Sequence, residues 1–129
     1  MKVPLPLYWT VKIKNFDMDI SRAQAMVDEW IKEHGVRYFD EKTNTLILME
    51  EVGELSRLMA RQYGEQSFKK NVGTEEVKRK IRDEISDVFF VLLCLCNQMD
   101  IDLKEGLIEN MKKKSGRDKD RHKANPKLK

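Results

Sequence analysis

A run of nine apolar residues constrains the fold of this chain most. It reads VFFVLLCLC, spans residues 88–96, and lies inside a helical pattern that extends from Thr74 to about Met99. A helix that is apolar on nearly all sides needs cover on more than one face. The other helices of a 129-residue chain can hardly provide that cover. We therefore expect this helix to lie against a neighbouring subunit in a homo-oligomer, either a homodimer or a homotetramer.

Three other stretches repeat their apolar residues with helical spacing. Thr74 is a plausible N-cap for the central helix, and Asp102 with Glu105 resembles a capping box for the last one. The segment VRYFDEKTN between the first two helices is expected to be a loop. Four helices with short connections predict an all-α, four-helix bundle-like subunit. The expected helices are about 19–35, 45–63, 74–99 and 102–116.

The two ends of the chain differ from its body. Residues 1–17 contain two prolines followed by alternating residues, which predicts a short extended N-terminal arm, and 18–116 forms the all-α domain. The net charge is +3, but nine Lys/Arg and two Asp give residues 112–129 a net charge of +7, leaving −4 elsewhere. We expect 117–129 to be a basic, flexible tail. A basic-tailed nucleic-acid-binding or adaptor module is the alternative interpretation. Because the tail lacks the interleaved aromatic residues of single-strand binders, nucleic acid is not the expected partner.

The cysteines and the lack of long apolar runs indicate the compartment. Cys94 and Cys96 are two residues apart on a helix and face different directions, so we expect buried free thiols in a reducing environment. The sequence has no apolar run of membrane-spanning length and no signal-peptide pattern at its start. We expect a cytoplasmic protein with no membrane partner.

Two acidic pairs occupy helix faces that should be packed. At about 100° per residue, Glu51 and Glu54 fall inside the apolar stripe of their helix, whereas Glu50 lies at its edge. Glu84 and Asp87 repeat this arrangement on the following helix. A solvated acidic face or salt bridges would be the ordinary explanation, but only one lysine, at position 80, shares the face.

A cation explains four inward carboxylates better than these alternatives, because burying like charges together is costly without compensation. His34 and His122 are the only histidines and neither lies in this constellation. Ligands that are all oxygen suit Mg²⁺ or Mn²⁺, and Mg²⁺ commonly bridges to substrate phosphates. The sequence therefore predicts a Mg²⁺ site for phosphate chemistry.

The same residues carry a family resemblance. Glu50-Glu51-Val52-Gly53-Glu54 followed by Glu84-Ile85-Ser86-Asp87 resembles the E-E-x-x-E…E-x-x-D signature of the MazG-like nucleoside triphosphate pyrophosphohydrolases, an all-α superfamily. The resemblance covers roughly residues 19–121. Within the superfamily, the sequence is similar to a small bacterial branch. It implies hydrolysis of an NTP or dNTP, including modified ones, between the α and β phosphates. A catalytically silent nucleotide sensor on the same fold is a further alternative.

The resemblance also implies roles for individual residues. The Mg²⁺ ligands would be Glu51, Glu54, Glu84 and Asp87, and the catalytic carboxylates Glu50 and Glu51, with Glu50 orienting water. Tyr38 and Phe39 would stack on the base, whereas Trp30 is assigned to the core. Lys113, Lys114 and Arg117 would bind phosphates, although Asn110 and Lys114 depart from the family's usual residues at their positions.

Overall fold

The computed structural model describes Lys12 and residues 17–129, and within these residues all regular structure is helical. The all-α prediction is therefore confirmed, while the expected N-terminal arm lies almost wholly outside the described residues. Four helices have at least 11 residues, and shorter helical turns follow two of them. The order is α2 (Ile20–Trp30), η1 (Ile31–Gly35), α3 (Glu41–Gln62), α4 (Thr74–Gln98), α5 (Leu103–Lys113), η2 (Lys114–Asp118), α6 (Lys119–Ala124) and η3 (Pro126–Leu128).

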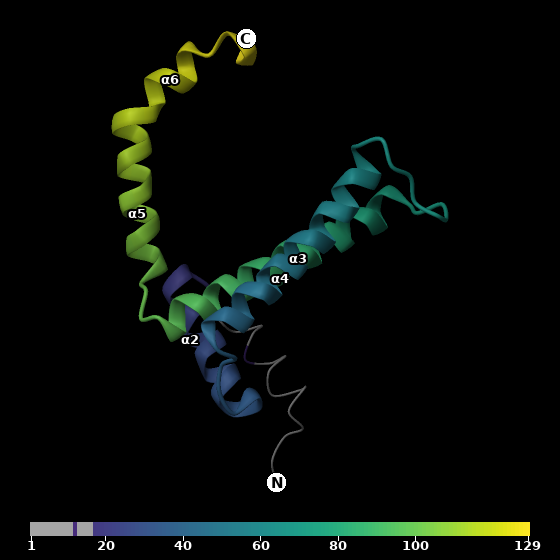
Figure 1. The fold of residues 1–129 in the computed structure, drawn as a ribbon. Coiled ribbons are helices and arrows are strands. Elements are labelled where there is room, and N and C mark those ends of the chain that lie inside the picture. Colours follow the sequence, from purple (N-terminus) through teal and green to yellow (C-terminus); the bar gives the residue numbers. More distant parts are fainter. Residues whose placement is uncertain (1–11, 13–16) are drawn as a thin grey trace.

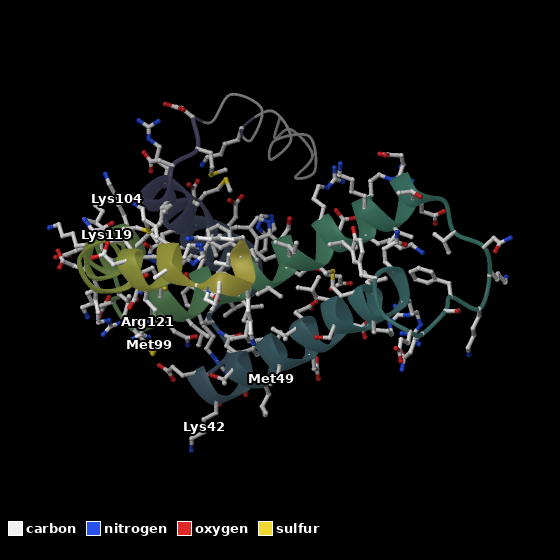
Figure 2. All side chains as sticks on the ribbon, turned by 90° about the horizontal axis from the view of Figure 1, so that it is seen from above. Lys42, Met49, Met99, Lys104, Lys119 and Arg121 are labelled. Atoms are coloured by element: carbon white, nitrogen blue, oxygen red, sulfur yellow. The ribbon has the colours of Figure 1, made fainter. Side chains whose placement is uncertain are left out.

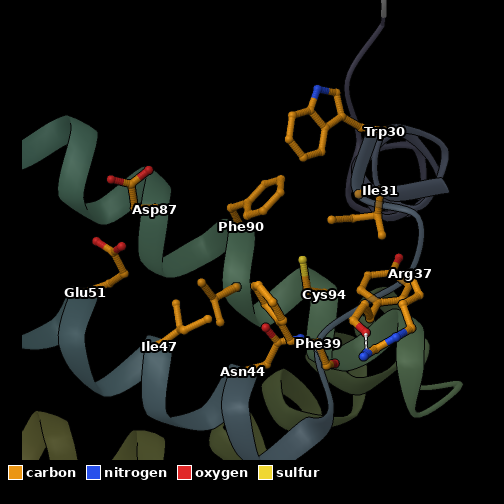
Figure 3. A pocket seen from close by; sticks show the side chains of 13 residues that line it. Trp30, Ile31, Arg37, Phe39, Asn44, Ile47, Glu51, Asp87, Phe90 and Cys94 are labelled. Atoms are coloured by element: carbon orange, nitrogen blue, oxygen red, sulfur yellow. Dashed lines mark hydrogen bonds between the residues drawn. The ribbon is translucent and has the colours of Figure 1, made fainter. Parts of the chain in front are cut away.

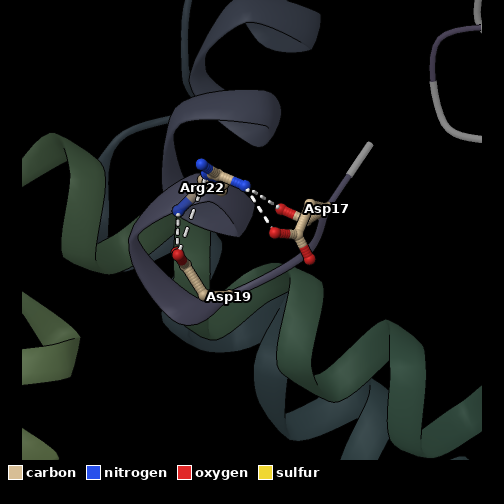
Figure 4. Close-up of polar contacts among 3 residues, drawn as sticks. All are labelled: Asp17, Asp19 and Arg22. Carbon is tan, nitrogen blue, oxygen red and sulfur yellow. Dashed lines mark hydrogen bonds and ion pairs between the residues drawn. The ribbon is translucent and has the colours of Figure 1, made fainter. Parts of the chain in front are cut away.

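The start of α2 is fixed by its own first residues. The Asp19 side chain accepts a hydrogen bond from the backbone N–H of Arg22 at 2.8 Å, which satisfies one of the free donors of the first turn. The Arg22 guanidinium reaches back to Asp17 at 3.0 Å (Figure 4). This pair of contacts holds the entering chain against the first turn.

Helix α3 begins four residues earlier than the periodicity predicts, so the expected loop is shorter. The Asp40 side chain caps the helix by accepting from the backbone N–H of Thr43 at 2.7 Å. At the other end, a Cβ on Gly64 would lie 2.6 Å from the carbonyl oxygen of Ala60. The helix therefore ends where only glycine fits. At α4, Gly73 is the N-cap and Thr74 the first helical residue.

Helices α3 and α4 form a long antiparallel hairpin, and α2 packs across the C-terminal half of α4 (Figure 1). The buried core between α2 and α4 contains Ala23, Val27, Leu93 and Cys94. Both cysteines are buried and free, as predicted. Large apolar side chains nevertheless remain on the outside: Met49, for example, points away from α4 and is 61% exposed (Figure 2).

Helix α5 leaves the hairpin instead of closing a bundle with it (Figure 1). Within the described part of the chain, α5 contacts α2, its first residue Leu103 packs against the core cluster, and none of its residues is buried. The Asp102 cap is confirmed, because its side chain accepts from the backbone N–H of Glu105 at 3.1 Å. The helical path continues through η2 and α6 beyond the predicted end near 115–116, and flexibility of 117–129 stays a prediction.

None of the helices in the described part of the chain combines the length and the apolar character needed to cross a membrane.

Candidate active site

Three of the predicted carboxylates meet in the middle of the α3–α4 hairpin. Glu51 from α3 and Glu84 and Asp87 from α4 each bring one oxygen within 4.8 Å of the others. The two α4 residues are one turn apart, so they lie on the same face of the helix. The antiparallel packing of the hairpin places Glu51 opposite them. Figure 3 shows Glu51 and Asp87 turned toward one another.

The electrostatics of this group favour a cation. The pKa of Glu51 is raised, first by partial burial, then by a hydrogen bond shared with Glu84, and then by the negative charges of Asp87, Glu84 and Glu50. One oxygen of Glu84, Oε2, is buried and has no hydrogen-bond partner among the described residues. A buried carboxylate oxygen without a donor is costly. A hard divalent cation between these oxygens would satisfy it.

The two other acids of the signature lie outside this group. Glu54 is exposed, and its carboxylate pairs with Arg57 at 3.4 Å, one turn further along α3. Glu50 is also exposed, next to Glu51. Glu54 as a fourth ligand and Glu50 as a catalytic residue therefore stay predictions.

A cavity of about 340 Å³ opens beside the acids (Figure 3). Glu51 and Asp87 lie at one end, and the rest of the wall is largely apolar. Trp30 and Phe90 make an edge-to-face contact in it, with ring centroids 5.9 Å apart and an interplanar angle of 87°. The lining consists of Trp30, Ile31, Gly35, Arg37, Tyr38, Phe39, Asn44, Ile47, Glu51, Asp87, Phe90, Val91 and Cys94.

The aromatic residues expected near the base take different places. Phe39 lines the cavity and is 60% exposed, so its ring is free to contact a ligand. Trp30 also lines it and is 39% exposed, so its assignment to the core is wrong. Its position at the last residue of α2 turns the indole toward Phe90 on α4. The aromatic wall is therefore built by three separate segments.

Tyr38 lines the same cavity but its hydroxyl is already engaged. It donates to Asp28 at 2.7 Å and accepts from the side-chain N–H of Asn97 at 3.1 Å. The ring packs against the buried core cluster. Burial and the neighbouring Asp28 raise the pKa of Tyr38, so the phenol stays protonated and donates. In this structure Tyr38 holds the loop between α2 and α3 in place.

The three basic residues expected at the phosphates lie elsewhere. Lys113 ends α5, whereas Lys114 and Arg117 belong to η2, on the segment that leads away from the hairpin (Figure 1). Arg117 pairs with Asp118 at 3.1 Å. None of the three lines the cavity beside the acids. Within one chain the structure does not bring them to the site.

Sequence reasoning missed several cavity residues, Asn44 and Phe90 among them. Asn44 comes seven residues before Glu51, so helical phase puts it within about 20° of that carboxylate. This signal was lost because position 44 was assigned to a loop. With the helix starting at Glu41, the same phase argument that found Glu51 finds Asn44.

Comparison with known proteins agrees with this geometry. The family model of the MazG nucleotide pyrophosphohydrolase domain matches residues 39–122. The protein YpjD of Bacillus subtilis (strain 168) is 41% identical over 105 residues, which are 81% of this chain and 91% of YpjD.

Two solved structures share the fold. A crystal structure of YpjD from Bacillus subtilis superposes with a TM-score of 0.66 at 36% identity, covering 78% of this chain and 97% of that one. A crystal structure of the Bacillus-conserved MazG protein, a nucleotide pyrophosphohydrolase, gives a TM-score of 0.64 at 33% identity, covering 80% and 96%. The family match, the identity and the paired carboxylates agree: the chain is an enzyme of the MazG nucleotide pyrophosphohydrolase family.

Proposed function

We propose that this enzyme hydrolyses a nucleoside triphosphate, ribo or deoxy and including modified bases, between its α and β phosphates, releasing the monophosphate and pyrophosphate. One observation carries the proposal: Glu51, Glu84 and Asp87 bring oxygens within 4.8 Å of one another at the end of an aromatic-lined cavity. The acids could bind a cation that in turn binds the phosphates, and the aromatic cavity could hold the base. The cavity also favours this function over a nucleic-acid adaptor.

The donor set fits Mg²⁺, or Mn²⁺ in its place. Three carboxylates would hold the ion, and a change of the Glu54 side chain away from Arg57 would add a fourth. When bound, the ion would supply positive charge for the phosphate oxygens and lower the pKa of a bound water. Glu50, beside Glu51, is the carboxylate left to orient the attacking water and accept its proton.

We also propose that the working enzyme is a homo-oligomer, a dimer or a tetramer. Helix α4 exposes Ile85, Phe89 and Leu92 by 38–52%, and α5 exposes Leu107, Ile108 and Met111 by 45–52%. Contiguous apolar surface of this kind marks an interaction site. The acidic body and the basic segment from Lys112 onward are complementary in charge. Association would cover α5 of one chain with a neighbour and bring Lys113, Lys114 and Arg117 to the neighbour's phosphates.

Pyrophosphate release from a panel of nucleotides, with Mg²⁺ and with EDTA, tests the activity. Glu51→Gln and Asp87→Asn should each lower kcat/KM at least about 100-fold, since even residues that only support a metal ligand cost about 10- to 100-fold when changed. Asp83→Asn is the matched control, because Asp83 adjoins Glu84 but pairs with Arg82 on the outside of α4. Turnover that persists in EDTA would contradict the proposal, and so would turnover retained by both Glu51→Gln and Asp87→Asn.

A further inference from the structure

Asn44 is the one buried polar side chain that the described part of the chain contains, and it lies in the wall of the cavity. Its exposed fraction is 5%. It stands in the first turn of α3, seven residues before Glu51. That spacing is a rise of about 10 Å along the helix, comparable to the length of a nucleoside. A ligand with its phosphates at the acids would therefore bring the far edge of its base to Asn44.

The orientation of the Asn44 amide is fixed by its neighbours. Its Nδ2 donates to Oε1 of Gln98 at 2.7 Å and to the backbone oxygen of Phe39 at 3.4 Å. Gln98 in turn donates from Nε2 to the same Phe39 oxygen at 2.8 Å. Because a backbone oxygen only accepts, the nitrogen of Asn44 must face it. The Oδ1 atom then faces the other way.

This leaves Oδ1 as an unused acceptor in a largely apolar cavity. No hydrogen bond within the described residues uses it, and Figure 3 shows the Asn44 side chain rising from α3 toward the interior of the cavity. Phe90, Ile47 and Val91 nearby offer nothing to bind it. A ligand that places a carbonyl here leaves two acceptors face to face, whereas an N–H group satisfies Oδ1.

We infer that Asn44 reads the base and selects triphosphates whose base carries an exocyclic amino group at its far edge, as adenine and cytosine do, over the oxo counterparts hypoxanthine and uracil. This rests on the proposed function and adds the substrate class to it. The hydrogen bond runs from the amino N–H of the base to Oδ1, while Phe39 and Phe90 contact the ring faces. Gln98 is a positioning residue that keeps the amide turned.

Two substrate pairs test the inference on the unmodified enzyme, because ATP and ITP, like CTP and UTP, differ at this edge mainly in amino against oxo. We expect kcat/KM to favour the amino member of each pair by about tenfold or more, mainly through KM. Equal or reversed preference in both pairs would overturn the inference.

Variants distinguish a role of Asn44 in recognising the base from a role in stabilising the fold. Asn44→Leu, which keeps the branched shape of the side chain, should bring both ratios close to one, whereas Gln98→Leu, which leaves Oδ1 in place but no longer fixes the amide, should lower both ratios without abolishing them. If Asn44→Leu lowers all four rates by one common factor, Asn44 is structural and the inference fails. If the unmodified enzyme turns over no nucleotide of the wider panel, the proposed function fails, and calorimetric binding of ATP against ITP still decides the inference.

Discussion

Glu51 shows how a side chain of the proposed metal site can weaken the fold. Its pKa is raised by partial burial and by the neighbouring acids, so its charged form is disfavoured in the metal-free protein. An acid with a raised folded-state pKa destabilises the fold as pH rises through the interval between its unfolded and folded values. A bound cation reverses this penalty.

The prediction at Glu51 concerns stability. Glu51→Gln should raise Tm of the metal-free enzyme at pH values where Glu51 of the unmodified protein is charged, because it removes a repelled charge. Mg²⁺ at about 100 times its Kd should stabilise the unmodified enzyme by about 2.7 kcal/mol and the variant far less. Thermal unfolding with and without Mg²⁺ measures both effects, with Asp83→Asn as control. Equal Mg²⁺ stabilisation of the unmodified enzyme and Glu51→Gln would remove Glu51 from the metal site.

Tyr38 offers a second test at this scale. Tyr38→Phe removes the hydroxyl that Asp28 and Asn97 both bind, so two part-buried groups lose a partner. We expect a loss of about 1–3 kcal/mol in the free energy of unfolding, measured by urea denaturation. Tyr63→Phe, at a residue 72% exposed, is the control and should change little. A neutral Tyr38→Phe would mean that the hydroxyl does not hold the loop.

At the scale of elements, the connection between α2 and α3 contains an unusual backbone. Val36 has φ 69° and ψ −53°, and the N–H of Arg37 donates to the oxygen of Gly35 at 2.7 Å. This is a γ-turn with positive φ at its centre, a strained conformation for a β-branched residue. The strained residue lies between Gly35 and Arg37, which both line the cavity.

Val36→Gly should therefore stabilise the enzyme. Backbone strain of this kind costs about 1–3 kcal/mol, and the extra freedom of glycine in the unfolded chain takes back about 0.5–1 kcal/mol. We expect a net gain of about 1 kcal/mol in the free energy of unfolding. The same change in a helix, Val52→Gly, should instead destabilise. Chemical denaturation of both variants decides, and a destabilised Val36→Gly would show that the turn is unstrained.

The elements also show what sequence reasoning can reach. Helical phase placed Glu51, Glu84 and Asp87 on facing surfaces because side-chain direction repeats every 3.6 residues. It could not place Phe39, whose position depends on the path of a short loop, and it assigned Trp30, at the end of α2, to the core. It also missed the start of α3, because the polar residues of a first turn resemble those of a loop until a cap such as Asp40 is recognised.

At the scale of the whole molecule, the basic residues and the acids are separated within one chain. The proposed association predicts that each site takes acids from one chain and cations from another. A chain with Glu51→Gln and a chain with Lys113→Ala and Arg117→Ala should each be nearly inactive alone. A mixed oligomer should regain activity, because one kind of site then combines intact acids with intact cations.

Differently tagged chains, co-expressed and purified through both tags, provide the mixed oligomer, and its pyrophosphate release is compared with that of each parent. A mixed oligomer as inactive as its parents would place acids and cations of each site in the same chain. Full activity of the Lys113→Ala, Arg117→Ala chain alone would show that these two basic residues have no role in the reaction. An unmodified chain that runs as a monomer in sedimentation would contradict the association itself.

The carboxylates that meet in the middle of α3 and α4 all come from one contiguous hairpin, whereas much of the aromatic wall comes from the segment before it. The acids and the aromatic residues Trp30, Tyr38 and Phe39 of the cavity wall are thus encoded in adjacent but separable stretches of the gene, whereas Asn44, the residue inferred to select the base, lies in the hairpin. Residues 30–39 could be exchanged between relatives as a cassette, leaving the acids untouched. A fold arranged in this way can acquire new substrates by recombination, without having to reinvent its reaction.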